Sequence, residues 1–306
     1  MASFHADEIR AQEQAGHVLG ETPAIRPLMP EQHRTFFAGL PYLFVGTVDA
    51  AGAPSATVLT GQPGFVQSPD AMHLTIASAL DPADPALRAL VPGAEAGLLG
   101  LDFATRRRNR ANGRVMHRDR DGLTIAIAQS FGNCPQYIQR RVAEPEPEMR
   151  QAGPIEPLAA LDPEAAALIH GADTLFVASR SRDGLADGGA DISHRGGRPG
   201  FVRVAGDVLT VPDFSGNRYF NTLGNLLGET RAALLFLDFE RGDLLMLQGH
   251  TVIDWSGAEA AQLTGAQRTW SFTVEAGWRR RAAVPLRWSR PEPAPQLART
   301  GIWETA

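Results

Sequence analysis

The chain has 306 residues, of which 43% are hydrophobic and 21% are charged. This composition is typical of a globular protein with an apolar core, and the length is sufficient for two domains. The net charge of −5 gives no electrostatic support for nucleic-acid binding. The sequence has no run of about 18 apolar residues, so no membrane span is expected. The polar, acidic first residues lack the pattern of a secretory signal, which predicts a cytoplasmic protein.

Residue types that are rare or missing exclude several kinds of chemistry. Cys134 is the only cysteine, which excludes an intrachain disulfide and a multi-cysteine metal site. The eight histidines are scattered, so no metal site is predicted. All 29 basic residues are arginine, which excludes a lysine Schiff base and a lysine-containing phosphate loop. A phosphate held by a side-chain cation must therefore be held by arginine, which can bind it through two hydrogen bonds.

The first half of the chain predicts a helical segment followed by a small antiparallel barrel. Residues 1–38 are predicted to form a mainly helical N-terminal arm. Short apolar segments separated by turns then predict a first barrel over residues 39–143. Its predicted elements are strands at 43–48 and 72–77, a helix at 85–90, and a hairpin of 97–103 with 114–115.

The second half predicts the same elements again. A Pro/Glu-rich segment at 144–153 indicates a linker, which we place at residues 144–160. A second barrel with a C-terminal arm is predicted over residues 161–306. Its predicted elements are strands at 174–179 and 208–212, a helix at 218–227, and a hairpin of 232–239 with 244–250.

The two halves also match residue by residue at an offset of about 136 positions, which indicates internal duplication. Residues 64–66 match 200–202 as Gly-Phe-Val, and residues 98–103 match 234–239 in a leucine-rich segment ending in Asp-Phe. Ordered matches at a nearly constant offset are unlike a single chance match. The predicted fold class is therefore mainly β with helices, built as two tandem split β-barrels.

Two segments of the second half are suited to holding a phosphate. Residues 191–202 combine a hydroxyl, an imidazole and arginines with a glycine-rich corner, where backbone can approach a ligand. Residues 212–226 place a turn before a predicted helix start near Arg218, where free N–H groups and the helix dipole favour an anion. The candidate cofactor-binding residues are Ser193, His194, Arg195, Gly200, Phe201, Pro212, Asp213, Phe214, Asn217, Arg218 and Asn221.

A structural interpretation of these residues is that Asn217 caps a helix and that the arginines form surface ion pairs. The repeat argues against it. Where the second copy has Asn217 and Arg218, the first has Asp81 and Pro82. A purely structural cap would not need that difference, so we predict that the second copy holds the phosphate and that the first copy is degenerate.

These segments resemble a known family. The sequences SHRGG-x-PGFV and PDFSGNRYFNTLGNL, followed by LLFLDF, are similar to flavin-nucleotide-binding proteins of the pyridoxamine 5′-phosphate oxidase-like superfamily, and FGNCPQYIQRR at 131–141 is similar to another motif of that group. The resemblance covers roughly residues 35–290. It implies a split barrel that binds FMN without a covalent link in a groove between two barrels. It leaves open whether the other barrel belongs to the same chain or to a second copy in a homodimer.

The resemblance implies an FMN-dependent oxidoreductase acting with a small-molecule substrate or electron donor. The substrate motifs of the vitamin oxidase are not recognisable, so the substrate is not carried over. His194 is the candidate catalytic residue, as a proton donor or as a purely structural hydrogen-bonding group. The alternative function is a non-catalytic flavin- or haem-binding module that acts as a sensor, store or carrier. No Gly-x-Gly-x-x-Gly unit for a nicotinamide domain is present.

Three further features each have two interpretations. Cys134 is either a redox group beside the flavin or, as is more common, a packing residue. The arginine-rich segment 106–110 either binds an anionic substrate or, the interpretation we favour, forms a solvated hairpin tip. Trp270, Trp278 and Trp288 either line the flavin groove or belong to the core.

Overall fold

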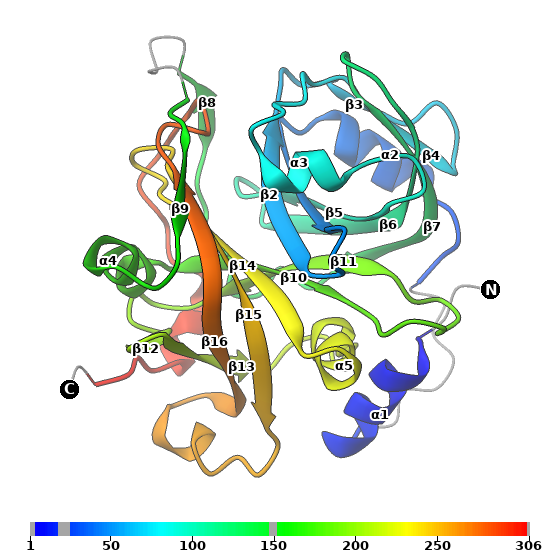
Figure 1. Ribbon diagram of the computed structural model, residues 1–306. Helices are drawn as coiled ribbons and strands as arrows, with labels where there is room; N and C mark the ends of the chain where they lie inside the picture. The colour runs from blue at the N-terminus through cyan, green and yellow to red at the C-terminus, as the bar shows by residue number, and fades with distance from the viewer. Residues whose placement is uncertain (1–3, 18–24, 147–151, 305–306) are drawn as a thin grey trace.

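The computed structural model describes residues 4–17, 25–146 and 152–304. It is mainly β with a few short helices, arranged as two curved sheets that pack against each other (Figure 1). The prediction of a mainly β chain with two tandem split β-barrels is confirmed. Among the residues described, no helix is long and apolar enough to cross a membrane.

The first sheet has seven strands in the order β2-β1-β5-β6-β7-β4-β3. It encloses an apolar cluster that includes Leu43, Leu74 and Ile125, all at most 1% exposed. Helix α2 contributes Phe37 to this cluster, so the second part of the predicted N-terminal arm belongs to the first barrel. The bounds are α2 (Glu31–Ala38), β1 (Tyr42–Val48), β2 (Pro54–Thr60), β3 (Val66–Gln67), β4 (His73–Ile76), α3 (Pro85–Ala89), β5 (Glu95–Asp102), β6 (Arg107–Arg118) and β7 (Leu123–Asn133).

The second sheet has the order β11-β10-β14-β15-β16-β13-β12, with β9 paired to β16. Its own apolar cluster includes Leu234, Trp270 and Phe272, which are all fully buried. The bounds are α4 (Pro163–Gly171), β10 (Thr174–Arg180), β11 (Ala190–Gly196), β12 (Arg203–Ala205), β13 (Val208–Phe214), α5 (Asn221–Gly228), β14 (Arg231–Leu237), β15 (Leu244–Asp254), the 3₁₀ turn η1 (Ala260–Gln262), β16 (Ala266–Arg280) and the 3₁₀ turn η2 (Pro295–Arg299).

The two sheets share one topology. Each strand of the first sheet occupies the same place in the order as a strand of the second, and α3 and α5 each follow the fourth strand of their half. Both halves also carry a β-bulge at the same point, between Asn112 and Gly113 in β6 and between Gln248 and Gly249 in β15. These bulges indicate which residues of the two halves are equivalent, because a register shift occurs at the same point of both strands and places Gly113 opposite Gly249 in the alignment of the halves.

Two local expectations differ from the structure. The segment predicted as a linker contains strands β8 (Ala143–Pro145), which pairs with β17 (Leu286–Trp288), and β9 (Ile155–Leu158). The helix expected from residue 218 begins only at Asn221, because Arg218 and Phe220 have left-handed φ values of 64° and 58°. Such backbone cannot continue a right-handed helix. Arg218 and Asn221 therefore do not share a helix face.

A third apolar cluster joins the two barrels. Phe44 of the first half stacks on Phe176 of the second, with ring centroids 3.7 Å apart. Trp278 and Trp288 belong to this cluster, and Trp270 lies in the core of the second barrel. All three tryptophans are therefore core residues, which is the second of the two interpretations given by the sequence. The shared cluster fixes the barrels against each other, so a site between them has rigid walls.

The N-terminal helix α1 (Ala6–Gln14) packs on α5 of the second half, on the side of the molecule where the chain begins (Figure 1). The contact is close because α5 has glycines there: a Cβ on Gly224 would lie 2.5 Å from the Cα of Glu8. Asn221 at the start of α5 donates from Nδ2 to Glu8 Oε1 at 2.5 Å. Helix α1 thus supports the helix whose first turn faces the candidate site.

Candidate functional site

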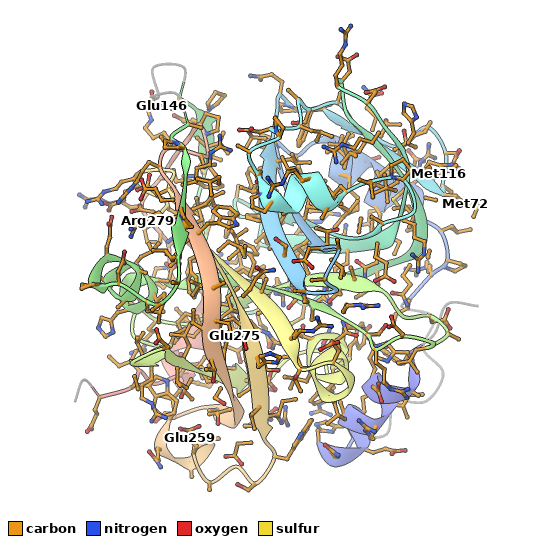
Figure 2. The ribbon with its side chains drawn as sticks, viewed as in Figure 1. Met72, Met116, Glu146, Glu259, Glu275 and Arg279 are labelled. Carbon is orange, nitrogen blue, oxygen red and sulfur yellow. The ribbon has the colours of Figure 1, made fainter. Side chains whose placement is uncertain are left out.

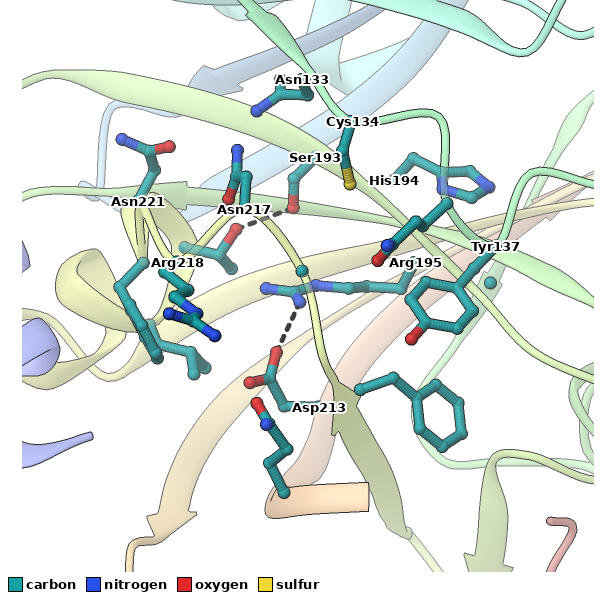
Figure 3. A pocket seen from close by; sticks show the side chains of 18 of the residues that line it. Asn133, Cys134, Tyr137, Ser193, His194, Arg195, Asp213, Asn217, Arg218 and Asn221 are labelled. Atoms are coloured by element: carbon teal, nitrogen blue, oxygen red, sulfur yellow. Dashed lines mark hydrogen bonds and ion pairs between the residues drawn. The ribbon is translucent and has the colours of Figure 1, made fainter. Parts of the chain in front are cut away.

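An open cavity of about 810 Å³ lies between the two halves (Figure 3). Strands β11 and β13, the segment 216–223 and residues 267–268 of β16 line it from the second half, and β6 with the segment 133–137 lines it from the first. We call it the arginine cavity. Residues of both barrels of one chain line it.

The structure brings together most of the residues that the sequence predicted. Of the candidates, those that line the cavity are Ser193, His194, Arg195, Pro212, Asp213, Phe214, Asn217, Arg218 and Asn221. Gly200 and Phe201 do not line it. Gly200 lies in the corner beside His170 and Ile302, and Phe201 is 1% exposed in the core of the second barrel. The Gly-Phe-Val repeat therefore marks a structural corner of each barrel, and the prediction that these two residues hold a cofactor has no support in the geometry.

The segment between β13 and α5 shapes one wall. Asn217 Oδ1 accepts a hydrogen bond from the backbone N–H of Tyr219 at 3.1 Å, so Asn217 closes a turn and does not cap the helix. Helix α5 has no side-chain cap, because its N-cap residue is Phe220. The first N–H groups of α5 therefore have no partner within the helix, and residues 221–223 line the cavity. This arrangement suits an anion.

Backbone strain is concentrated around the same cavity. Six non-glycine residues of the described chain have positive φ, and three of them, Tyr137, Arg218 and Phe220, line the arginine cavity. Each such residue costs about 1 kcal/mol or more and persists only where the surroundings hold it. The Tyr137 hydroxyl donates to the carbonyl of Ser215 at 3.0 Å, which links the first-half segment to the turn before α5.

The cavity is strongly cationic. Asp213 is the one carboxylate among its lining residues. The arginines that line it come from both halves and are Arg108, Arg110, Arg195, Arg218 and Arg268. Asp213 is 6% exposed and holds both Arg195, at 2.7 Å, and Arg268. One carboxylate between two guanidiniums leaves an excess of positive charge, whereas the chain as a whole carries −5. An anionic ligand is the natural complement of such a site.

The positions of Arg108 and Arg110 differ from what the sequence predicted. The segment 106–110 was expected to be a solvated hairpin tip, but Arg110 is 7% exposed and donates to Asp191 at 2.6 Å. Arg108 donates from Nε to the carbonyl of Cys134 at 2.9 Å, and burial lowers its pKa to about 10. No carboxylate pairs with Arg108 among the residues described. The reason for the wrong prediction is tertiary: strand β6 contacts β11 of the second barrel, so Arg108 and Arg110 lie at the interface of the two barrels.

His194 supports an arginine and does not face the cavity as an acid. Its Nδ1 lies 3.1 Å from Arg108 Nη1 and must accept, since a guanidinium only donates. The ring is 4% exposed and lies edge-to-face on Phe103 and Phe176. Burial, together with Arg108, holds the pKa of His194 well below its usual value. The imidazole is therefore neutral near pH 7, which favours the structural interpretation over the proton donor.

Several polar atoms around the cavity are buried without a partner among the described residues. They are Asn133 Oδ1, Gln136 Oε1, His194 Nε2 and the Nε atoms of Arg110 and Arg195. Buried polar atoms are almost always hydrogen-bonded in native proteins, so orphaned acceptors and donors around one cavity indicate a polar ligand. Asn133 and Gln136 flank Cys134, which is partly buried beside Arg108.

The sequence analysis missed the first-half side of the site. Asn133, Gln136 and Tyr137 were missed on this side, and Thr222 and Arg268 were missed on the second-half side. Arg108 and Arg110 belong to the segment 106–110, for which anion binding was the interpretation that we did not favour. The signal for part of this set was present, because Asn133, Gln136 and Tyr137 lie in the FGNCPQYIQRR segment that resembles a family motif. The arginines of β6 could not be placed, since their side of the strand faces the other barrel.

At the position equivalent to this cavity, buried apolar side chains stand in place of the arginines. By the shared bulge, Arg108 and Arg110 correspond to Leu244 and Met246, which are 3% and 1% exposed in the inter-barrel cluster.

On the other side of this equivalent position, an ion pair takes the place of two amides. Asn133 is the partner of Arg108 in β7, and its equivalent, the partner of Leu244 in β16, is Arg280. Arg280 forms an ion pair with Asp81, the residue aligned with Asn217. The amides of Asn133 and Asn217 line the arginine cavity. At the equivalent position their places are taken by the ion pair of Arg280 with Asp81, beside the buried Leu244 and Met246. The two copies therefore differ in charge and in side-chain type at this position, and the assignment of the phosphate to the second copy remains a prediction.

No model of a known protein family matches the chain, and no curated protein matches it. Solved structures similar to it include a protein related to general stress protein 26 of B. subtilis (pyridoxinephosphate oxidase family) from Clostridium acetobutylicum, with 16% identity over 42% of this chain and 92% of that chain and a TM-score of 0.30. An FAD-binding protein from Mesorhizobium loti has 11% identity over 41% of this chain and 97% of its own, with a TM-score of 0.28. HutZ, the heme storage protein from Vibrio cholerae, has 14% identity over 39% of this chain and 92% of its own, with a TM-score of 0.28. The chain is thus similar, over about two fifths of its length, to a protein of the pyridoxinephosphate oxidase family.

Proposed function

We propose that the chain binds FMN in the arginine cavity and acts as an FMN-dependent oxidoreductase. The observation that carries the proposal is the lining itself, in which five arginines and the free first turn of α5 surround a single carboxylate. FMN needs a cationic subsite for its phosphate and hydrogen-bonding groups for the polar edge of its ring system. The cavity offers both within one open volume of about 810 Å³.

The residues fit such a group at both ends. Arg218 and Arg195, together with the N–H groups at the start of α5, would hold the phosphate. Arg218 has no hydrogen bond or ion pair within the described chain, so it is free to bind an anion. At the first-half side, the orphaned amide oxygens of Asn133 and Gln136 would accept from an N–H of the ring system.

The bound flavin would supply hydride or electron transfer, and the protein's part is to bind, orient and exclude water. Asp213 aligns Arg195 and Arg268, and His194 orients Arg108 through its Nδ1. The neutral imidazole of His194 adds no charge to the cavity. An electron donor or organic substrate would enter through the open side of the cavity.

The test compares FMN with riboflavin, which has the same ring system without the phosphate. Affinity of both compounds is measured by quenching of flavin fluorescence in the parent chain and in Arg218→Ala. We expect FMN to bind more tightly than riboflavin in the parent. Loss of a charge-assisted hydrogen bond should weaken FMN by about 10- to 100-fold in the variant and change riboflavin little.

Arg120→Ala is the matched control, because Arg120 is 92% exposed at the turn between β6 and β7 and does not line the cavity. It should leave both affinities unchanged. Equal loss for FMN and riboflavin in Arg218→Ala, or no loss for either, would contradict the phosphate assignment. Steady-state oxidation of NADH or NADPH by the FMN-loaded chain then separates an enzyme from a non-catalytic flavin carrier.

A further inference from the structure

A second cavity, of about 570 Å³, lies on the other side of the arginine cavity's wall. Helix α1, strands β5, β6 and β7, the segment 187–191 and helix α5 enclose it. The ion pair between Arg110 and Asp191 separates the two cavities, since Arg110 lines the first and Asp191 lines the second. We call it the acidic cavity.

The carboxylates of Glu95, Asp187 and Asp191 line this cavity, and Glu8 lines it with a carboxyl whose pKa is raised by burial to about 8, so that this group is protonated near pH 7. Its one lining arginine is Arg114, whose side chain is 62% exposed. His5 also lines it, and burial lowers the pKa of its imidazole, so that ring contributes no positive charge near pH 7. The charge of the acidic cavity is thus opposite to that of the arginine cavity.

The atoms without partners in this lining are acceptors. Asn112 is 8% exposed, and its Nδ2 donates to Asp191 Oδ1 at 3.0 Å. A carboxylate can only accept, so this contact fixes the orientation of the amide and leaves Asn112 Oδ1 as the orphaned atom. Glu95 Oε2 is also buried without a hydrogen bond, and it forms an ion pair with Arg180, whose Nε lies 3.9 Å away. Glu95 Oε1 is already bound by Arg114 at 3.0 Å.

We infer that the acidic cavity binds a small organic cation that carries N–H donors, such as a primary ammonium or a guanidinium group. Its N–H groups would satisfy Asn112 Oδ1 and Glu95 Oε2, and its charge would complement the surrounding carboxylates. A quaternary ammonium has the charge without the donors and would leave both oxygens unsatisfied. The inference does not depend on the flavin proposal, because neither orphaned oxygen lines the arginine cavity.

The experiment uses the flavin-free chain and two probes, methylguanidinium and tetramethylammonium, at constant ionic strength. Binding is followed by ligand-observed NMR and isothermal calorimetry. Methylguanidinium should bind saturably and tetramethylammonium should bind at least about tenfold more weakly. In Glu95→Gln the remaining carbonyl oxygen can still accept from Arg114, so the fold is retained, and methylguanidinium should lose about tenfold in affinity.

Glu275→Gln is the matched control. Glu275, which is labelled in Figure 2, is 56% exposed on β16 and does not line the cavity, so its replacement should leave methylguanidinium binding unchanged. Absence of saturable binding to the parent chain would overturn the inference. Equal binding of the two probes, or unchanged binding in Glu95→Gln, would overturn it as well. Each of these results leaves the FMN test unaffected, because that test reads a different cavity.

Discussion

Replacing Glu8 by glutamine tests how α1 is held on the site-forming helix. Glu8 is 4% exposed, and its carboxyl accepts from Asn221 Nδ2 at 2.5 Å and from the backbone N–H of His5 at 2.9 Å. Burial raises the pKa of Glu8 from 4.5 to about 8, although both hydrogen bonds act to lower it. The folded chain therefore holds a proton on this carboxyl at neutral pH.

The sign of the pH dependence follows from proton binding. Below pH 4.5 the carboxyl is protonated in both the folded and the unfolded chain. Between pH 4.5 and about 8 only the folded chain retains the proton, so raising the pH favours the unfolded chain. The free energy of unfolding should fall by about 1.4 kcal/mol per pH unit from this group in that window.

The assay is urea unfolding at a series of pH values from 5 to 8, comparing Glu8→Gln with the parent. Glutamine can accept only one of the two hydrogen bonds, so the variant should be about 1 kcal/mol less stable at pH 5. It lacks the titrating group, so it should become the more stable protein by pH 8. Glu13→Gln, on the exposed side of the same helix, should follow the parent. If the free energies of unfolding of Glu8→Gln and the parent changed equally with pH, the carboxyl of Glu8 would not be buried and protonated in the folded chain.

Two further substitutions test neighbouring contacts. Gly224→Ala would place a Cβ 2.5 Å from the Cα of Glu8, so α1 must shift; we expect a loss of about 1–3 kcal/mol and faster amide hydrogen exchange in residues 6–14. Gly171→Ala has no atom within 4 Å of its new Cβ and should change neither quantity. Tyr137→Phe removes the hydrogen bond to the Ser215 carbonyl, so stopped-flow measurements should show FMN dissociating about fivefold faster with unchanged stoichiometry. An unchanged dissociation rate would show that this link does not close the cavity.

The barrels could be predicted from the sequence because their signals are local. Short apolar segments bounded by Gly, Pro and Asp turns placed β1, β10 and β14 within about two residues of their observed bounds. The start of α5 was misplaced because left-handed backbone at Arg218 and Phe220 has no sequence signature in non-glycine residues.

The site was predicted only on its second-half side. The phosphate-binding candidates are clustered in the chain, so a sequence pattern could identify Ser193, Arg195 and Asn217 together. The opposite wall depends on packing between barrels, which brings Arg108 within hydrogen-bonding distance of His194 across 86 positions of the chain. A helix docking such as α1 on α5 is equally non-local and was missed for the same reason.

The most direct test of the central claim is the stoichiometry of FMN binding. The arginine cavity is open, whereas at the equivalent position Leu244 and Met246 are buried and Asp81 forms an ion pair with Arg280. Titration of the purified chain with FMN, followed by flavin fluorescence and equilibrium dialysis, should therefore saturate at one FMN per chain. Saturation at two per chain would contradict the closed counterpart, and no saturable uptake of FMN would contradict the proposed function itself.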